Sequence, residues 1–232
     1  MLTTSDVLWL QRTIGNASVG SLLVQRKVKH TTGKEVDTFL SASPFIKKYV
    51  ADKIRKGIKA EGHVHIHAAA DFEKAWEKYA TKRTNPDTGA TFTVAEARAW
   101  EPTVNAFRDG SEIHIHEDRG EAGTAIHEAM HLFSADSYRA KLGADANEGT
   151  TEYFTRMICD ESKIVRGAFY VDERRSIERL IAATSKDKVA AAYYQGATAE
   201  LEAAVDAKKK GTFAKWVLYL KMRKYADADA LL

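Results

Sequence analysis

Seven of the chain's eight histidines are concentrated in two short stretches. Three lie in the sequence GHVHIH, and four lie in SEIHIHEDRGEAGTAIHEAMH, which covers residues 111–131. Histidine is the commonest metal ligand in proteins, and both HxH and HExxH arrangements can bind a metal ion. The first question is therefore which of these histidines have the spacing and the neighbours that a metal site requires.

The pentapeptide HEAMH has the spacing of a helical metal site. His127 and His131 stand at positions i and i+4, so on a helix they share one face and can meet a single ion. Glu128 would lie beside that ion, close enough to take a proton from a metal-activated water. The neighbouring helix positions are small or apolar. The pattern therefore indicates a buried helix that presents three polar side chains on one face.

A catalytic zinc site needs a third protein ligand and keeps a fourth position open. The sequence NEGTTEYF begins sixteen residues after His131, beyond a segment rich enough in loop residues to reverse the chain. Glu148, near the start of a second helix, could then reach back to the ion. Glu152 follows at i+4 and could accept a hydrogen bond from the second nitrogen of a ligand histidine, which would fix that ring's orientation.

HEAMH followed by NEGTTEY resembles the gluzincin metallopeptidases, the clan of thermolysin-like and M1-aminopeptidase-like enzymes. The resemblance covers roughly residues 60–160. It implies a zincin-like fold, a peptide or protein substrate and a Zn²⁺ cofactor. It also implies zinc ligands at His127, His131 and Glu148, a general base at Glu128 and a supporting acid at Glu152.

Further expectations follow from the same resemblance. The stretch SEIHIHE resembles the clan's edge strand, which binds substrate backbone by strand addition. The absence of a GxMEN-type motif favours an endopeptidase over an aminopeptidase. Clan members usually add a tyrosine or histidine that stabilises the oxyanion. Tyr170, which directly precedes a predicted helix, is the first candidate for that catalytic role, ahead of Tyr193, Tyr194 and Tyr219.

The HxH histidines admit other interpretations. Residues i and i+2 of a strand point to one face, so His63, His65 and His67, or His114 and His116, could form a metal patch like that of a cupin. A cupin needs many regular strands, whereas the second half of this chain is predicted to be helical. We expect these histidines to lie on the solvent or cleft side of strands, with His114 or His116 beside the substrate groove.

The periodicity predicts an α+β fold: a small mixed sheet with an edge strand, then an active-site helix and a mostly helical C-terminal half. Residues 30–43 are interpreted as a linker, so the chain divides into residues 1–43 and a zincin-like domain over residues 44–232. The expected elements are helices over 44–62, 71–83, 93–102, 120–142 and 147–165, a strand over 63–68, and a strand–turn–strand over 104–118. The expected local signals are N-caps at Asp71 and at Asp145 or Asn147, and a type I′ turn at Asp109-Gly110.

Composition excludes several classes of protein. A net charge of only +3 gives no indication of a nucleic-acid partner. The single cysteine, Cys159, excludes an internal disulfide and is expected to be a buried structural thiol. No stretch approaches the roughly 20 apolar residues that span a bilayer, and the N-terminus lacks the features of a Sec-type signal peptide.

The N-terminal segment LQRTIGNASVGSLLVQR resembles the start of cargo proteins of extracellular contractile injection systems, which are phage-tail-like bacterial particles. The resemblance implies that residues 1–30 load or tether the chain through structural proteins of such a particle. It further implies a toxin or effector that is made in the bacterial cytoplasm and exported inside the particle. Two alternatives remain open: a helical pair that packs on the catalytic domain, and a non-enzymatic particle component that retains a zincin fold.

Overall fold

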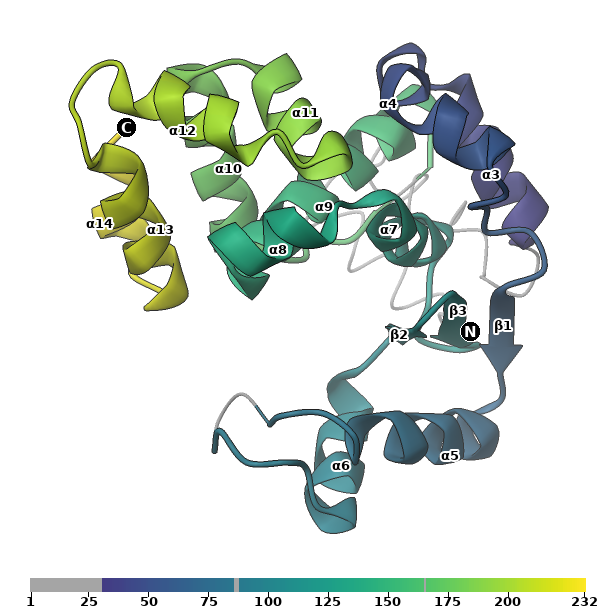
Figure 1. Ribbon diagram of the computed structural model, residues 1–232. Coiled ribbons are helices and arrows are strands. Elements are labelled where there is room, and N and C mark those ends of the chain that lie inside the picture. The colour runs from purple at the N-terminus through teal and green to yellow at the C-terminus, as the bar shows by residue number, and fades with distance from the viewer. Residues whose placement is uncertain (1–30, 86–87, 165) are drawn as a thin grey trace, which may run out of the picture.

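The computed structural model of the protein describes residues 31–85, 88–164 and 166–232, and the proposed loading segment of residues 1–30 lies outside them. The described residues form an α+β fold in which helices predominate, as the sequence predicts (Figure 1). Its sheet consists of β1 (Val64–His67), β2 (Ala106–Asp109) and β3 (Glu112–His116). The strand order is β1-β3-β2, with β1 parallel and β2 antiparallel to β3.

The helices precede, interrupt and follow this sheet. In chain order they are α3 (Gly33–Ala42), α4 (Pro44–Arg55), α5 (Ala69–Ala80), α6 (Val94–Trp100), the 3-10 helix η2 (Glu101–Thr103), α7 (Ala122–Phe133), α8 (Asp136–Leu142), α9 (Ala144–Glu161), α10 (Val171–Ala183), α11 (Lys186–Gln195), α12 (Thr198–Asp206), α13 (Thr212–Lys221) and α14 (Tyr225–Asp229). Among the described residues, no helix has both the length and the apolar character needed to cross a bilayer.

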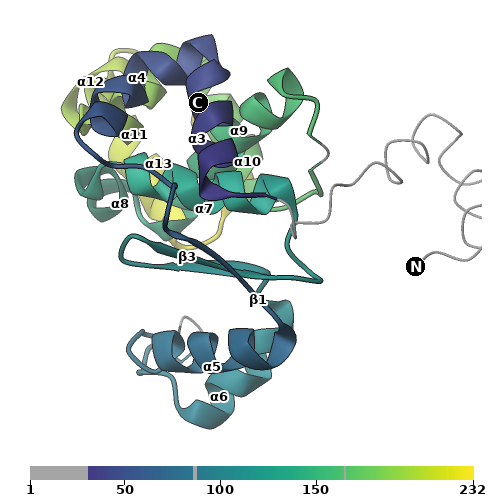
Figure 2. The ribbon, with the colours of Figure 1, turned by 90° about the vertical axis from the view of Figure 1, so that its right-hand side faces the viewer.

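The sheet separates two helical layers. Helix α7 lies against one face, and α5 with α6 lies against the other (Figure 2). Alternation along β3 explains this division, because Ile113 and Ile115 are fully buried in the large core that includes α7. His114 points to the opposite face and stacks on Phe107 with ring centroids 4.7 Å apart. The sheet therefore lies between α7 and the α5–α6 pair and contacts both.

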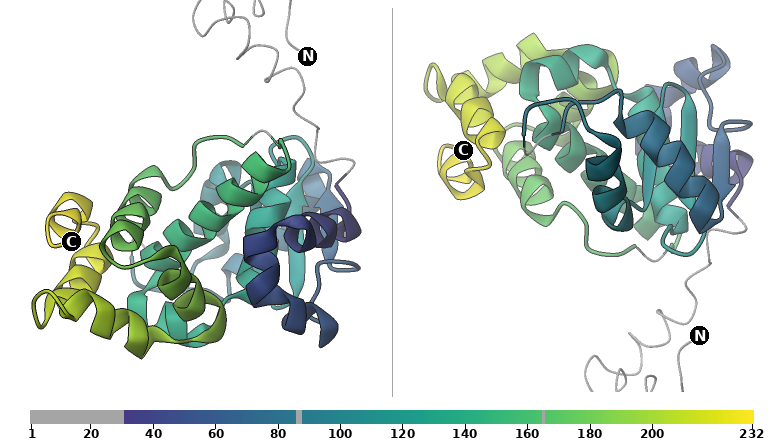
Figure 3. Two further views of the ribbon diagram at one scale, coloured as in Figure 1. Left: turned by 90° about the horizontal axis from the view of Figure 1, so that it is seen from above. Right: turned by 90° about the horizontal axis from the view of Figure 1, so that it is seen from below.

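Two hydrophobic cores result from this layering. The larger joins α3, α4 and α7 to the C-terminal helices, which extend away from α3 and α4 (Figure 3). Cys159 is buried in it, as expected, and burial raises the pKa of this thiol to about 12. The smaller core lies between the sheet and α5–α6, and consists of Phe72, Trp76, Ala80, Phe92, Ala97 and Phe107.

The linker interpretation of residues 30–43 is wrong for residues 33–42, which form α3. Thr32 starts this helix with a capping box that includes Glu35. Val36 and Leu40 then lie one turn apart, and both are fully buried in the large core. Phe39 is the third large apolar side chain of this short, otherwise polar segment, and its packing with Val36 and Leu40 anchors the segment to the rest of the fold.

The predicted helix over residues 120–142 is divided at Ser134. Ser134 has an extended backbone, and the next amide, that of Ala135, donates a hydrogen bond to the carbonyl oxygen of Tyr193 at 2.7 Å. A long-range contact therefore interrupts an otherwise continuous helical pattern.

The predicted N-caps are wrong because both helices begin earlier than expected. Helix α9 follows Gly143, which has a positive φ of 96°, so Asp145 and Asn147 lie inside the helix. Helix α5 begins at Ala69, which places Asp71 in its first turn.

The strand order corrects the predicted position of the edge strand. β3, which contains His114 and His116, is the central strand, and β2 lies at the edge. Asp109 pairs with Glu112 across the turn, and only Gly110 has a positive φ there, so the turn is not type I′, which requires two such residues. The local pattern identified the hairpin but not which of its strands would have a free edge.

Gly149 in α9 permits the close approach of α10. A Cβ atom on Gly149 would lie 2.5 Å from the carbonyl oxygen of Glu173.

Exchange of glycine for alanine inside a helix normally stabilises a protein by about 0.5–1 kcal/mol. For Gly149→Ala we expect the opposite sign, a loss of about 1–3 kcal/mol in the free energy of unfolding, measured by urea denaturation. The control is Ala140→Gly at an exposed position of α8, which measures the difference in helix propensity between the two residues without a packing contact. If Gly149→Ala stabilised the protein, the close contact with Glu173 would be contradicted.

Candidate metal centre

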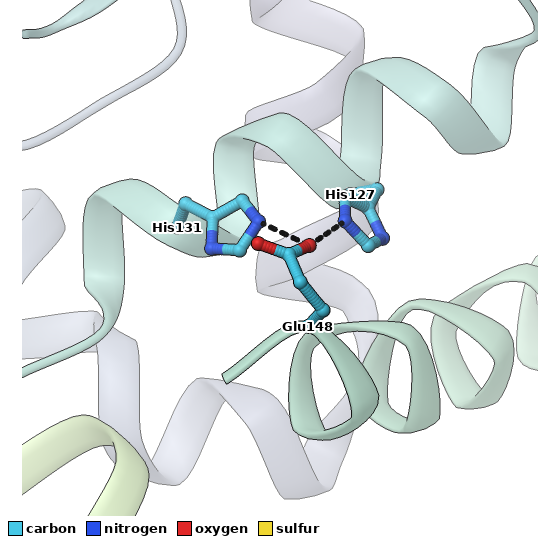
Figure 4. Close-up of side chains that lie close together, drawn as sticks. All are labelled: His127, His131 and Glu148. Atoms are coloured by element: carbon cyan, nitrogen blue, oxygen red, sulfur yellow. Dashed lines mark hydrogen bonds and ion pairs between the residues drawn. The ribbon is translucent and has the colours of Figure 1, made fainter. Parts of the chain in front are cut away.

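Helix α7 presents two histidines to the interior. Ten of its twelve residues are buried, which agrees with the small and apolar side chains around HEAMH. His127 and His131 lie one turn apart with their ring centroids separated by 5.0 Å. Both rings point toward the start of α9 (Figure 4).

Glu148 extends from α9 into the space between the two rings (Figure 4). Its Oε2 atom lies 3.2 Å from Nε2 of His127 and 3.3 Å from Nε2 of His131. Each of these three side chains offers one possible metal-ligand atom, and the three atoms all lie within 4.8 Å of one another. The structure thus brings together the three residues that the sequence predicts as metal ligands.

The separations between these atoms are those expected for ligands of one metal ion, and they also fall within the range of a long hydrogen bond. Two ligands at ~2.0–2.1 Å from one tetrahedral zinc ion lie about 3.3 Å apart. A charge-assisted N–H···O hydrogen bond is typically shorter, about 2.7–2.9 Å. The observed 3.2 Å and 3.3 Å match the first geometry for both histidines at once.

The second nitrogen of each histidine also has a partner. Glu152 Oε2 lies 3.2 Å from Nδ1 of His127, as the sequence predicts. Asn147 Nδ2 lies 3.1 Å from Nδ1 of His131, while the buried Oδ1 of Asn147 has no hydrogen-bond partner. Rotation of this amide by 180° would present Oδ1 to Nδ1 of His131. A histidine that binds metal through Nε2 carries a proton on Nδ1 and needs such an acceptor, so the unpartnered oxygen fits a metal-bound His131.

Two arginines that sequence reasoning missed hold Glu152 in place. Arg166 Nη2 lies 2.5 Å from Oε2 of Glu152, and Arg156 Nε lies 2.9 Å from Oε1. The Glu152 side chain is fully buried, and burial acts to raise its pKa. The contacts with His127 and Arg166 outweigh burial and lower that pKa, so Glu152 stays ionised as an acceptor.

The signals for these supporting residues differ in strength. Asn147 directly precedes Glu148 in the NEG sequence, and Thr151 Oγ1, 3.3 Å from Nδ1 of His131, stands four residues later on α9. Helical spacing could have identified both. Arg166 lies in the irregular segment between α9 and α10, so no periodic signal marks it.

Negative charge surrounds His127. Burial acts to lower its pKa, but the carboxylates of Glu148, Glu152 and Glu128 outweigh burial and raise the pKa to about 9. Because Arg156 and Arg166 already compensate Glu152, the charges of Glu128 and Glu148 remain for a cation to balance. This donor set of two imidazoles and one carboxylate is one that zinc accepts in catalytic sites.

The site opens into a cleft of about 800 Å³ between α7 and the β2–α5–α6 side of the molecule. Glu128 lines this cleft together with His127, His131 and Glu148. No hydrogen bond or ion pair joins Glu128 to another residue in the described part of the chain. Its carboxylate is therefore available to a bound molecule.

Tyr170 also lines the cleft, next to the predicted ligands. Its ring stacks on that of His127, with centroids 5.3 Å apart and an angle of 10° between the planes. Its backbone is left-handed, with a φ of 46°, which is unusual for a residue with a side chain. The charge of Glu148 and burial raise the pKa of its hydroxyl, which therefore keeps its proton and can donate a hydrogen bond.

The side chains of the HxH histidines have partners of their own, away from the candidate metal ligands. Glu112 lies 2.8 Å from Nδ1 of His63 and 2.6 Å from Nε2 of His65, and these contacts lower the pKa of Glu112 to about 2. His67 Nε2 lies 2.9 Å from Nδ1 of His114. These separations are hydrogen-bond lengths, shorter than those between ligands of one metal ion.

The predicted place of His114 and His116 beside the substrate groove is wrong. His114 packs on Phe107, and His116 meets the ring of Phe72 with centroids 5.3 Å apart. Neither histidine lines the cleft: both lie on the central strand β3, where the rings of Phe107 and Phe72 pack against them. The cleft is lined by the edge strand β2 instead.

We expect purified protein to bind about one zinc ion per chain and His127→Ala to lose it, because no other described side chain can replace this ligand. Metal content after dialysis, measured by atomic emission, checks this. His114→Ala is the matched control and should keep its zinc. Equal zinc content in wild type and His127→Ala would contradict a site at His127. Zinc lost only from His114→Ala would mean that the HxH histidines bind the ion instead.

The HxH face should make stability dependent on pH. Burial, followed by the charge of neighbouring histidines, lowers the pKa of both His67 and His114 in the folded protein. The unfolded chain therefore binds more protons below about pH 6.5, and the free energy of unfolding should fall as the pH drops through that value. Urea denaturation at pH 7.5 and 5.5 with a chelator present should show a smaller fall for His67→Gln/His114→Gln. If the free energy of unfolding of the double variant fell as much as that of the wild type, His67 and His114 would not be the cause of the pH dependence.

Comparison with known proteins gives no match: no protein-family model, no curated protein and no solved structure matches this chain. The function proposed below therefore rests on the site's own residues and on the resemblance of their motifs.

Proposed function

We propose that the protein is a zinc-dependent hydrolase of peptide bonds, most simply an endopeptidase. The observation that carries this proposal is the position of Glu148 Oε2, nearly equidistant from His127 and His131, beside a cleft that Glu128 lines. The resemblance of HEAMH and NEGTTEY to gluzincin metallopeptidases supports the same activity. The α+β fold with a small mixed sheet before the HEAMH helix is compatible with a zincin-like architecture.

Each residue of the site has a distinct role in this reaction. His127, His131 and Glu148 would hold the zinc ion. Zinc held there would supply Lewis acidity, lowering the pKa of water and polarising a peptide carbonyl group. Glu128 takes a proton from the attacking water and then delivers it to the nitrogen of the leaving amine.

The residues behind the ligands keep them in place. Glu152 accepts the Nδ1 proton of His127. With its amide rotated so that Oδ1 faces His131, Asn147 would accept the Nδ1 proton of that ring, and both Nε2 atoms would stay directed at one point. Arg156 and Arg166 keep Glu152 ionised inside the protein. This arrangement fixes the tautomers of both histidines.

Two features of the cleft suit an extended peptide. β2 pairs only with β3 among the described strands, so its outer edge can add a substrate strand, in place of the β3 edge expected from sequence. The Tyr170 hydroxyl can donate to the oxyanion that forms at the attacked carbonyl group. Both features line the same cleft as Glu128.

Delivery as a toxin or effector is a further part of the proposal. It rests on the resemblance of residues 1–30 to cargo of contractile injection particles, and those residues lie outside the described structure. The alternative, a non-enzymatic component of such a particle, would keep the zinc site without peptide hydrolysis.

Replacement of the general base separates these two functions. Glu128→Gln should keep its zinc, because Glu128 is not a ligand, and should lose about 10²–10⁴-fold in kcat/KM, because the glutamine amide cannot accept the proton. The measurement is cleavage of a fluorogenic peptide library, together with the zinc content.

The matched control is Glu161→Gln, which removes the same charge from an exposed position at the end of α9. It should cleave as the wild type does. Undiminished cleavage by Glu128→Gln would remove Glu128 from the mechanism. Zinc-loaded wild type that cleaves no peptide in the library would favour the non-enzymatic alternative.

A further inference from the structure

Besides Arg166, which pairs with Glu152, three arginines from separate elements line the cleft. Arg83 follows the C-terminal end of α5, Arg108 lies on the edge strand β2, and Arg139 lies on α8. The carboxylates that line the cleft are Glu128 and Glu148, which the proposed reaction already uses. The remaining charge on the cleft wall is therefore positive.

Two of these arginines have no acidic partner. Arg83 lies 3.6 Å from Asp109 and also covers the ring of Tyr79 at 4.8 Å. Arg108 donates a hydrogen bond from Nη1 to the carbonyl oxygen of Gly110 at 2.9 Å. In the described part of the chain, no carboxylate lies within 4.0 Å of Arg108 or Arg139. Unpaired guanidinium groups on a cleft wall are suited to bind an anionic ligand.

The sheet directs Arg108 toward the metal side of the cleft. Arg108 pairs with Ile113, so it shares the face of the sheet that is turned toward α7, whereas Phe107 points to the opposite face. Arg108 lines the cleft together with His131.

Arg139 lies near the His131 end of the cleft, because α8 follows directly after the C-terminal end of α7, where His131 is located. It is exposed and lines the cleft together with His131 and Tyr79. The two unpaired arginines thus come from separate elements, β2 and α8, that line one cleft.

We propose that Arg108 and Arg139 bind a carboxylate group of the substrate at the His131 end of the cleft. The group is an aspartate or glutamate side chain, or the C-terminal carboxylate of a peptide. This inference rests on the proposed peptidase function and specifies its substrate class. A guanidinium group recognises a carboxylate through paired hydrogen bonds, and a neutral amide cannot replace that interaction.

Binding to an inactive protein tests this without depending on cleavage. Zinc-loaded Glu128→Gln is titrated with fluorescent peptides that differ only in glutamate or glutamine, each with an amidated C-terminus. We expect the glutamate peptide to bind about 10–100-fold more tightly, the range for a hydrogen-bonded charge. A third peptide, neutral but with a free C-terminal carboxylate, distinguishes the two sources of the group.

Variants then assign the preference to the two arginines. Arg108→Gln/Arg139→Gln, on the same Glu128→Gln background, should reduce the preference to near unity. Arg179→Gln, an exposed arginine of α10 outside the cleft, should leave it unchanged. Arg139→Glu replaces only an exposed side chain, which keeps the fold intact, and should shift the preference toward a lysine peptide.

The outcomes separate this inference from the proposed activity. Equal binding of the charged and neutral peptides, or a preference that survives in the double variant, would overturn the inference even if the wild type cleaves peptides. A preference lost only in the arginine variants would support it even if the wild type cleaved none of the peptides tested.

Discussion

One carboxylate placed between two imidazoles is the interaction on which the site depends. Glu148 joins α9 to α7 through contacts of 3.2 Å and 3.3 Å with His127 and His131. Burial of ionisable groups in this way is costly unless each has a partner. Here Arg156 and Arg166 compensate the negative charge of Glu152. The negative charges of Glu128 and Glu148, which face the cleft, can then be balanced by a bound cation. The packing of α9 against α7 therefore assembles the candidate metal centre as well as part of the core.

The sheet provides the second constraint, because its two faces have different tasks. The isoleucine face of β3 supports α7, while the histidine face packs on α5 and is closed by hydrogen bonds among its own side chains. The edge strand β2 is left beside the cleft, where it contributes both a free backbone edge and Arg108. The two sets of closely spaced histidines thus lie in different surroundings, one at the candidate metal centre and one between the sheet and α5.

Local spacing allowed much of the site to be predicted. The i, i+4 histidines of α7 and the acidic residues of α9 depend on helical periodicity, and the structure brings all of them together. The parts that could not be predicted depend on long-range contacts. The break at Ser134 requires the carbonyl of Tyr193, the central position of β3 requires pairing with β1, and Arg166 reaches Glu152 from an irregular segment. The burial of α3 depends on a core assembled from distant helices.

The central claim is that one ion binds between α7 and α9 through two histidines and one carboxylate. Zinc K-edge X-ray absorption of the protein loaded with one equivalent of zinc tests it most directly. The site described here predicts two imidazole ligands, with oxygen atoms completing a four-coordinate shell at about 2.0–2.1 Å. A shell with three or more imidazoles, or one unchanged in His131→Ala, would contradict it.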